Sequence, residues 1–252
     1  MTGVEDRVPS AATSTERAEQ MLRHDARAAL AQARDVLDAA GPTMNTDLDP
    51  HTYQRWLLIK GAAQAHIGET EDGARIMREV KAWAEENQDG PLLADTHRRL
   101  SALFRRVGDP ALMLEHAVTA VDLLDDDAHD AVRADHLLGL ADALGASGSF
   151  TDSIARYHEA RRLAERCGDR YLQLAVLNNL AYTQYEAGLA DEAVVTAQRL
   201  RAEPPPTGSC SRPTTPTRSR APTPPPGGTA RRPPSSSRSV TRRTTARTAT
   251  GW

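Results

Sequence analysis

The 252-residue chain has few of the features that mark secreted, membrane-spanning or disulfide-rich proteins. Its two cysteines, Cys167 and Cys210, form neither a disulfide framework nor a paired metal-binding motif. No run of roughly 18 apolar residues occurs, which argues against an ordinary membrane-spanning helix. The start of the chain contains Glu5, Asp6 and Arg7 and no apolar stretch, unlike a signal peptide. We therefore expect a reduced, cytoplasmic protein without a membrane partner.

Aromatic residues are also scarce. They make up 4% of the chain, whereas hydrophobic residues as a whole make up 39%. A core of Ala and Leu with few rings suits the close packing of helices better than a thick β-sandwich. The composition therefore favours an all-α protein.

Catalytic motifs are missing. The sequence has no Gly-rich phosphate loop, no G-x-S-x-G, no H-E-x-x-H and no paired C-x-x-C. One polar cluster contains Asp125, Asp126, Asp127, His129, Asp130, Asp135 and His136. Such side chains bind divalent metals, but without a fixed ligand spacing a solvated loop is the simpler interpretation. We predict no enzyme activity, no cofactor and no metal site.

What the sequence does contain is a period of forty residues. Gly68, Gly108, Gly148 and Gly188 recur at this spacing within HIGETEDGARIM, RVGDPALMLEHA, ASGSFTDSIARY and EAGLADEAVVTA. Each segment has an apolar run at helical spacing, a glycine, a short polar turn and a second such run. Because glycine readily adopts the left-handed C-cap conformation, each segment predicts a helix hairpin. The residues expected to cap the second helices are Thr70, Asp109, Thr151 and Asp191.

These hairpins resemble the tetratricopeptide repeat (TPR), in which two helices lock through small and large residues at fixed offsets. Gly73, Ser153 and Ala193 hold the small position of the second helix, and Met113 departs from it. The period exceeds the usual length of about 34 residues, which implies longer helices or linkers. The resemblance implies a right-handed α-solenoid with four repeats in residues 51–203.

One further helix is predicted before the repeats. The run from Thr13 to Glu16 reads T-S-T-E, a capping box, and Gly41 is followed by a proline that ends the helical pattern. We expect residues 14–41 to form a helix that covers the open end of the first repeat, and residues 1–13 to be disordered.

The TPR resemblance also implies a binding surface. In that family the first helix of each repeat lines a concave groove, with ligand contacts at fixed positions. Carried over, these positions are Arg55, Asp95, Arg98, Arg105, Arg106, Asp135, Asp142, Asn178, Tyr182 and Tyr185. Arginine suits carboxylates, asparagine pairs with peptide backbone, and tyrosine offers rigid contact area. The predicted partner is a protein or peptide; a merely solvated helix face is the alternative at each position.

On this interpretation Arg98 and Arg105 lie on a solvated face. Replacing both by alanine is then expected to change stability by no more than about 1 kcal/mol.

Longer segments suggest a biological setting. R-W-L-L-I-K-G, S-A-L-F-R-R-V-G-D and R-C-G-D-R-Y-L-Q-L-A-V-L-N-N-L-A-Y-T-Q-Y-E-A-G fall between Arg55 and Leu200. This region resembles the N-terminal repeats of bacterial diguanylate cyclases, where it precedes a GGDEF domain. The chain has no GGDEF motif, so the resemblance confers no cyclase activity. Two functions stay open: an interaction or sensory module of a signalling protein, or the inert front part of such a cyclase.

The last segment, residues 204–252, differs from the rest. It is almost wholly Pro, Thr, Ser, Arg, Ala and Gly, with nine Arg and no Lys, Asp or Glu. The net charge is −3, so this segment carries +9 and the preceding 203 residues carry −12. A disordered basic tail is the ordinary interpretation, and such tails often bind nucleic acid.

A shifted reading frame of GC-rich DNA explains the composition of residues 204–252 better than a disordered tail does. In the shifted frame, each codon consists of the third base of one present codon and the first two bases of the next. The stretch from Thr217 to Ser239 can then read D-T-L-A-R-A-Y-A-A-A-G-R-Y-G-E-A-A-A-V-L-E-P-V. This is a fifth TPR-like repeat, with its turn glycine at position 227, thirty-nine residues after Gly188. The basic charge is then incidental, and nucleic acid is not expected as a partner. The last in-frame repeat would lack its neighbour and is expected to fray or self-associate.

Overall fold

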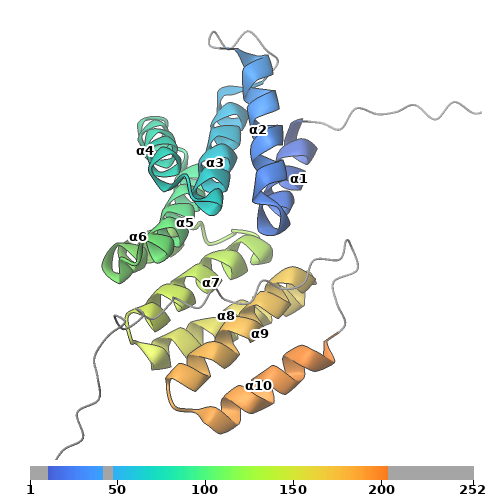
Figure 1. Ribbon diagram of the computed structural model, residues 1–252, viewed down its shortest axis with the longest axis vertical. Helices are drawn as coiled ribbons and strands as arrows, with labels where there is room; N and C mark the ends of the chain where they lie inside the picture. Colours follow the sequence, from blue (N-terminus) through green and yellow to red (C-terminus); the bar gives the residue numbers. More distant parts are fainter. Residues whose placement is uncertain (1–10, 42–47, 204–252) are drawn as a thin grey trace, which may run out of the picture. The chain divides into compact units, whose positions relative to one another are not determined.

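The computed structural model describes residues 11–41 and 48–203, which form ten helices and no strand (Figure 1). The helices are α1 (Ala11–His24), α2 (Ala26–Ala40), α3 (Pro50–Ile67), α4 (Thr70–Glu86), α5 (Gly90–Val107), α6 (Pro110–Asp122), α7 (Asp130–Ala146), α8 (Phe150–Cys167), α9 (Arg170–Glu186) and α10 (Ala190–Ala202). The predicted all-α class is confirmed. Most of the predicted disordered N-terminus, and the whole segment 204–252, lie outside the described residues.

Four helix hairpins follow one another from α3 to α10. Gly68, Gly108, Gly148 and Gly188 join the two helices of each hairpin, and all four have a positive φ, between 78° and 101°. This conformation carries a steric penalty for residues with a Cβ, so glycine is needed at each turn. The predicted hairpins and their forty-residue spacing are confirmed.

Aspartate starts three of the four first helices. The carboxylates of Asp49, Asp89 and Asp169 accept hydrogen bonds from the backbone N–H three residues later. This bond satisfies one of the free N–H groups of the first turn. The equivalent residue before α7 is His129, which forms no such side-chain bond.

The predicted caps of the second helices are confirmed at only one position. Asp109 accepts a hydrogen bond from the N–H of Leu112 at the start of α6. Thr70, Thr151 and Asp191 instead lie inside the first turn of α4, α8 and α10. The helices begin one or two residues earlier than expected, and their N-cap residues form no side-chain cap bond.

Small residues let the two helices of a hairpin approach closely. A Cβ on Gly73 would lie 2.5 Å from the carbonyl oxygen of Gly61, which no side chain tolerates. In the third hairpin the hydroxyl of Ser153 donates to the carbonyl of Ala141 at 2.7 Å. In the second hairpin the roles are exchanged, because the hydroxyl of Ser101 on α5 donates to the carbonyl of Met113 at 2.9 Å. Met113 departs from the family pattern, and the small residue lies on the opposite helix.

The hairpins stack in chain order. The second helices α4, α6 and α8 each pack against the first helix of the next hairpin, and α3, α5, α7 and α9 contact one another in succession. The buried residues form consecutive hydrophobic clusters along this stack. This arrangement is the α-solenoid that the repeats predict.

The N-terminal helix differs from the prediction. Instead of one helix over residues 14–41, two helices meet at Asp25, which has non-helical dihedral angles and caps α2 through the N–H of Ala28. Both α1 and α2 pack against α3. Sequence periodicity continues through this break, because both helices bury alanines and leucines at the same spacing.

Candidate binding face of the first helices

The predicted contact residues lie on α3, α5, α7 and α9, and we call the surface that carries them the first-helix face. Its polar side chains, together with two residues of α1, form two groups of ion pairs and hydrogen bonds. The first row consists of Glu19, Arg23, Arg55, Asp95, Arg98, Asp135 and Asp169, and the second row consists of Arg105, Asp142, Asn178 and Asn179. The two rows differ in what their charges contact.

Arg98 is the centre of the first row. Its guanidinium lies 2.6 Å from Asp95 on the same helix and 3.1 Å from Asp135 on α7. Arg99 also contacts Asp95, at 2.9 Å. About four fifths of the Arg98 and Asp135 side chains are buried, so these charges are largely removed from water.

The pKa values of this group follow from its pairing. Burial acts to raise the pKa of Asp95, but Arg98 and Arg99 hold it below its ordinary value. Arg98 and Arg23 do the same for the pKa of Asp135. Burial acts to lower the pKa of Arg98, and the two aspartates raise it. All three side chains are therefore charged at neutral pH, and each charge already has a partner.

Helix α1 closes this row from outside the repeats. Glu19 accepts a hydrogen bond from Arg55 at 2.6 Å. Arg23 lies 3.8 Å from both Asp135 and Asp169, and its guanidinium carbon is 4.9 Å from the ring centre of Tyr171. The end of α1 thus contacts α7 and the start of α9, in addition to its packing on α3.

Four of the predicted ligand contacts form ion pairs within the chain. Arg55, Asp95, Arg98 and Asp135 do not project as free groups from a solvated face, because charges of the same chain neutralise them. The sequence resemblance covers only the repeats, so it carried no information about Glu19 and Arg23. Their charges at i and i+4 of the preceding helix were the only available signal.

The second row is connected through Asp142. Its carboxylate accepts hydrogen bonds from Tyr157 at 2.6 Å and Asn179 at 2.9 Å, and Asn179 in turn accepts one from Asn178. Arg105 is its nearest cation, at 4.0 Å, with half of its side chain exposed. Burial raises the pKa of Asp142, and Arg105 and the hydrogen bonds offset this effect only in part.

The helices α5 and α9, which carry part of the second row, also carry exposed side chains. Tyr182 and Tyr185 on α9 are 55% and 67% exposed, which is unusual for large aromatic residues. Arg105 and Arg106 end α5, and burial together with Arg105 lowers the pKa of Arg106. Four of the predicted contact residues, Arg105, Arg106, Tyr182 and Tyr185, are thus exposed.

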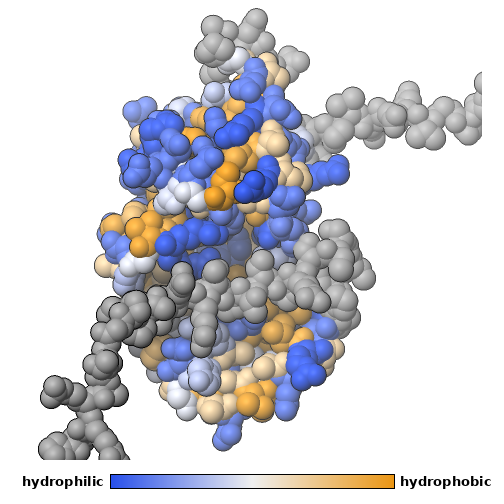
Figure 2. Space-filling model, in the orientation of Figure 1, coloured by the Kyte–Doolittle hydropathy of each residue, from blue (hydrophilic) through white to orange (hydrophobic). Residues whose placement is uncertain are grey.

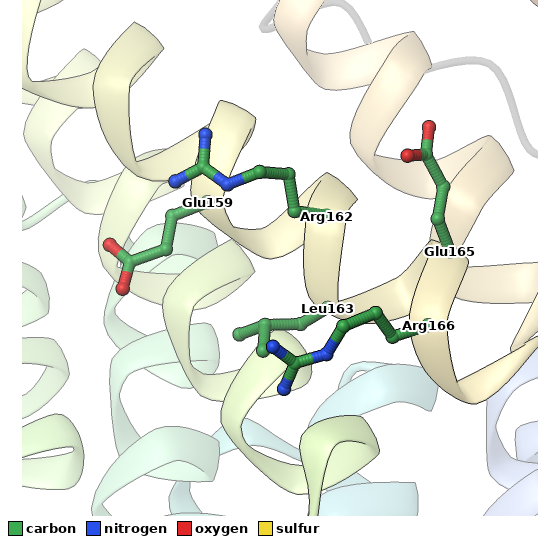
Figure 3. Close-up of a pocket in the computed structure, with 5 residues that line it drawn as sticks. All are labelled: Glu159, Arg162, Leu163, Glu165 and Arg166. Atoms are coloured by element: carbon green, nitrogen blue, oxygen red, sulfur yellow. The ribbon is translucent and has the colours of Figure 1, made fainter.

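Two other polar regions lie outside the first helices α3, α5, α7 and α9. Asp125, Asp126, Asp127 and His129 lie in the α6–α7 connection, and no three metal-ligating side chains come together in the described part of the chain. A hollow of about 630 Å³ beside α8 is lined by Glu159, Arg162, Leu163, Glu165 and Arg166 (Figure 3). Leu163 and Arg166 extend side by side there, while Glu165 points away from them.

A histidine pair lies between α5 and α6. The Nδ1 atoms of His97 and His116 are 3.0 Å apart, and Phe104 stacks on His116 with ring centres 5.3 Å apart. Burial and His116 lower the pKa of His97 to about 4, so this imidazole is neutral at pH 7. The pair packs between the two helices of its hairpin.

Among the described residues, no helix is long and apolar enough to cross a membrane.

Comparison with known proteins shows the fold. No protein-family model and no curated protein matches the chain. Among solved structures, it is similar to the nearly identical TPR-like repeats of a putative kinesin light chain from Podosopora anserina, with 15% identity, a TM-score of 0.53, and coverage of 76% of this chain and 93% of that chain. It is also similar to BtubC (BKLC) from P. vanneervenii, with 16% identity, a TM-score of 0.55, and coverage of 84% and 98%.

The chain thus has the fold of a TPR-like repeat protein. Identities this low carry the fold alone, and the ligand has to be argued from the first-helix face itself.

Proposed function

We propose that this protein binds a segment of another protein at the second row of the first-helix face. TPR-like scaffolds stack helix pairs into extended binding surfaces and generally mediate protein interactions. The observation that carries the proposal is the difference in pairing between the two rows. Arg105 is half exposed at 4.0 Å from a carboxylate that Tyr157 and Asn179 hold, and Tyr182 and Tyr185 are exposed on α9, whereas the first row is neutralised within the chain.

The chemistry of the second row favours an acidic ligand segment with a large apolar side chain. Arg105 and Arg106 offer guanidinium groups that match carboxylates. Tyr182 and Tyr185 offer flat contact area with little rotational freedom to lose. Asn178 donates to Asn179 in the second row and can pair with the peptide backbone of the ligand.

A selection from a random peptide library tests this proposal. Peptides that bind the purified protein are expected to be enriched in Asp or Glu together with an aromatic or large aliphatic residue. Arg105→Glu should weaken their binding at least tenfold by reversing the local charge. Arg78→Glu, an exposed position on α4, is the matched control and should leave binding unchanged. Selected peptides that bind both variants equally would place the binding surface elsewhere.

The resemblance to cyclase N-terminal regions supports a setting for this binding. On that basis the module acts in the bacterial cytoplasm as the interaction or sensory part of a signalling protein, without catalysis of its own. The sequence has no GGDEF motif. Incubation of the purified protein with GTP should therefore produce no cyclic di-GMP, and its formation would contradict this assignment.

A further inference from the structure

The last second helix, α10, is exposed at positions that the other second helices bury. Positions forty residues apart can be compared directly. Met77, Ala117 and Tyr157 are buried, and so are Val80, Ala120 and Ala160. Their counterparts Ala197 and Leu200 are only half-buried.

The same holds at the first apolar position of these helices. Ala74, Leu114 and Ile154 pack against hydrophobic clusters. Val194 is instead 54% exposed, and the adjacent Val195 is 61% exposed. In the space-filling view apolar surface is visible over α10 between hydrophilic atoms (Figure 2).

A missing neighbour explains this exposure. α4, α6 and α8 each pack against two first helices, namely that of their own hairpin and that of the next. Among the described helices, α10 contacts only α9. Because the repeat geometry is regular, the element that fits this face is the first helix of a further hairpin. Such a helix would occupy the position that α5, α7 and α9 occupy on the hairpins before them.

The residue types of segment 204–252 indicate that such a helix is encoded in another reading frame of the same DNA. Every residue from 204 to 252 except Val240 has a codon whose second base is C or G. The preceding residues contain many Leu, Val, Asp and Glu, whose codons have T or A there. If the reading frame is shifted by one base, the present second base is the true third base. That is the codon position at which GC-rich coding DNA concentrates G and C.

The shifted reading also has the register of the repeats. Leu140-Ala141 and Leu180-Ala181 are equivalent pairs in α7 and α9. The shifted frame can read Leu and Ala at positions 219 and 220, thirty-nine residues after the second pair. It can read glycine at position 227, at the same distance from the turn residue Gly188, and alanine at position 232, at that distance from the buried Ala193.

We propose that the outer face of α10 is the docking surface for the first helix of a fifth hairpin. That hairpin is encoded by the same DNA as residues 204–252, one base out of frame. The occupant is thus an amphipathic helix of the TPR type, with Leu and Ala facing Val194, Ala197 and Leu200.

Two chains test this proposal. One is the 252-residue protein as it stands, and the other carries a single-base insertion between the codons of Glu203 and Thr217. In the second chain, amide hydrogen exchange in residues 190–202 should slow at least tenfold, and the helical circular dichroism signal should grow. Val194→Asp in this longer-solenoid chain is the control and should return α10 to the faster exchange.

Other outcomes overturn the proposal. If the 252-residue chain dimerises with rising concentration and α10 becomes protected, the occupant is a second copy. Unchanged exchange after the insertion would also overturn it. The coding DNA gives a readout that does not depend on folding: a stop codon in the shifted frame before position 239 excludes the fifth hairpin. None of these results alters peptide binding at Arg105, so the proposed function is tested separately.

Discussion

The two polar rows of the first-helix face have similar residues and different roles. In the first row, Asp95, Arg98 and Asp135 neutralise one another in a largely buried site. In the second row, Asp142 is held by a tyrosine and an asparagine, while Arg105 stays half exposed at 4.0 Å. A charged residue at a ligand position of the repeat is therefore not by itself a ligand contact. Whether it is free depends on the side chains that the neighbouring helices bring to it.

The largest expected difference between the rows concerns stability. Arg98→Ala leaves Asp95 with Arg99 alone and Asp135 with the more distant Arg23 alone, so it should lower the free energy of unfolding by about 2 kcal/mol. This expectation replaces the small effect that a solvated face would give. Arg105→Ala, the matched change in the second row, should cost no more than about 0.5 kcal/mol. Urea unfolding of both variants measures the difference, and equal losses would remove the distinction between the rows.

The anchor of the second row comes next in size. Tyr157→Phe removes the hydroxyl that donates to Asp142 at 2.6 Å and keeps the ring, which is 2% exposed. A hydrogen bond to a charged acceptor contributes about 1.5 kcal/mol, and we expect a loss of that size in urea unfolding. The variant should also bind the selected peptides less tightly, because Asp142 is then held by Asn179 alone. A stable variant with intact peptide binding would show that Tyr157 only fills space.

The contact of α1 with the repeats is expected to contribute less to the free energy of unfolding. Arg23→Ala removes two ion pairs of 3.8 Å and a cation–π contact in a site that is about one third exposed. We expect a loss of about 1 kcal/mol, which shrinks at high salt. Hydrogen exchange in α1 and α2 should become faster, while α5 and α6 stay unchanged. If the whole chain loosens equally, α1 is an integral part of the stack and not a separate closing element.

The smallest expected effect concerns pH: the contributions of Asp95 and Asp142 to stability should change in opposite directions as the pH rises. The folded-state pKa of Asp95 is lowered, so its contribution to stability is present above its unfolded value of 3.8 and is lost as the pH falls below it. The folded-state pKa of Asp142 is raised, so its contribution is full below 3.8 and is lost as the pH rises through the folded value. Relative to the unmodified chain, Asp95→Asn should be more costly at pH 7 than at pH 3, and Asp142→Asn less costly. Urea unfolding at the two pH values checks this, and equal signs would contradict it.

Most of the fold could be predicted from the sequence, because it depends on local chemistry. The four turn glycines mark left-handed backbone, and the apolar spacing between them marks helices. The boundaries at Thr70, Thr151 and Asp191 were placed too late, since an oxygen-bearing side chain also fits the first turn of a helix. The break at Asp25 was missed because the apolar spacing continues through it.

The candidate site could be predicted only in part. The TPR resemblance predicts Arg105, Arg106, Tyr182 and Tyr185 as contacts on one face, and their side chains are exposed in the structure. It also selected Arg55, Arg98 and Asp135, whose charges are used inside the chain. The position of a residue within the repeat predicts which face of the helix it occupies. It does not predict which charged residue a neighbouring helix places beside it.

The sequence by itself determined the class of the protein, because a helix hairpin is set by glycine, capping groups and apolar spacing within some forty residues. Only the tertiary structure decided which polar residues are free. Arg23 meets Asp135 and Asp169 across more than one hundred residues of chain, and such a contact leaves no periodic signal. The electrostatics of the face depend on these distances, since the interaction of two charges weakens with their separation and with the water between them.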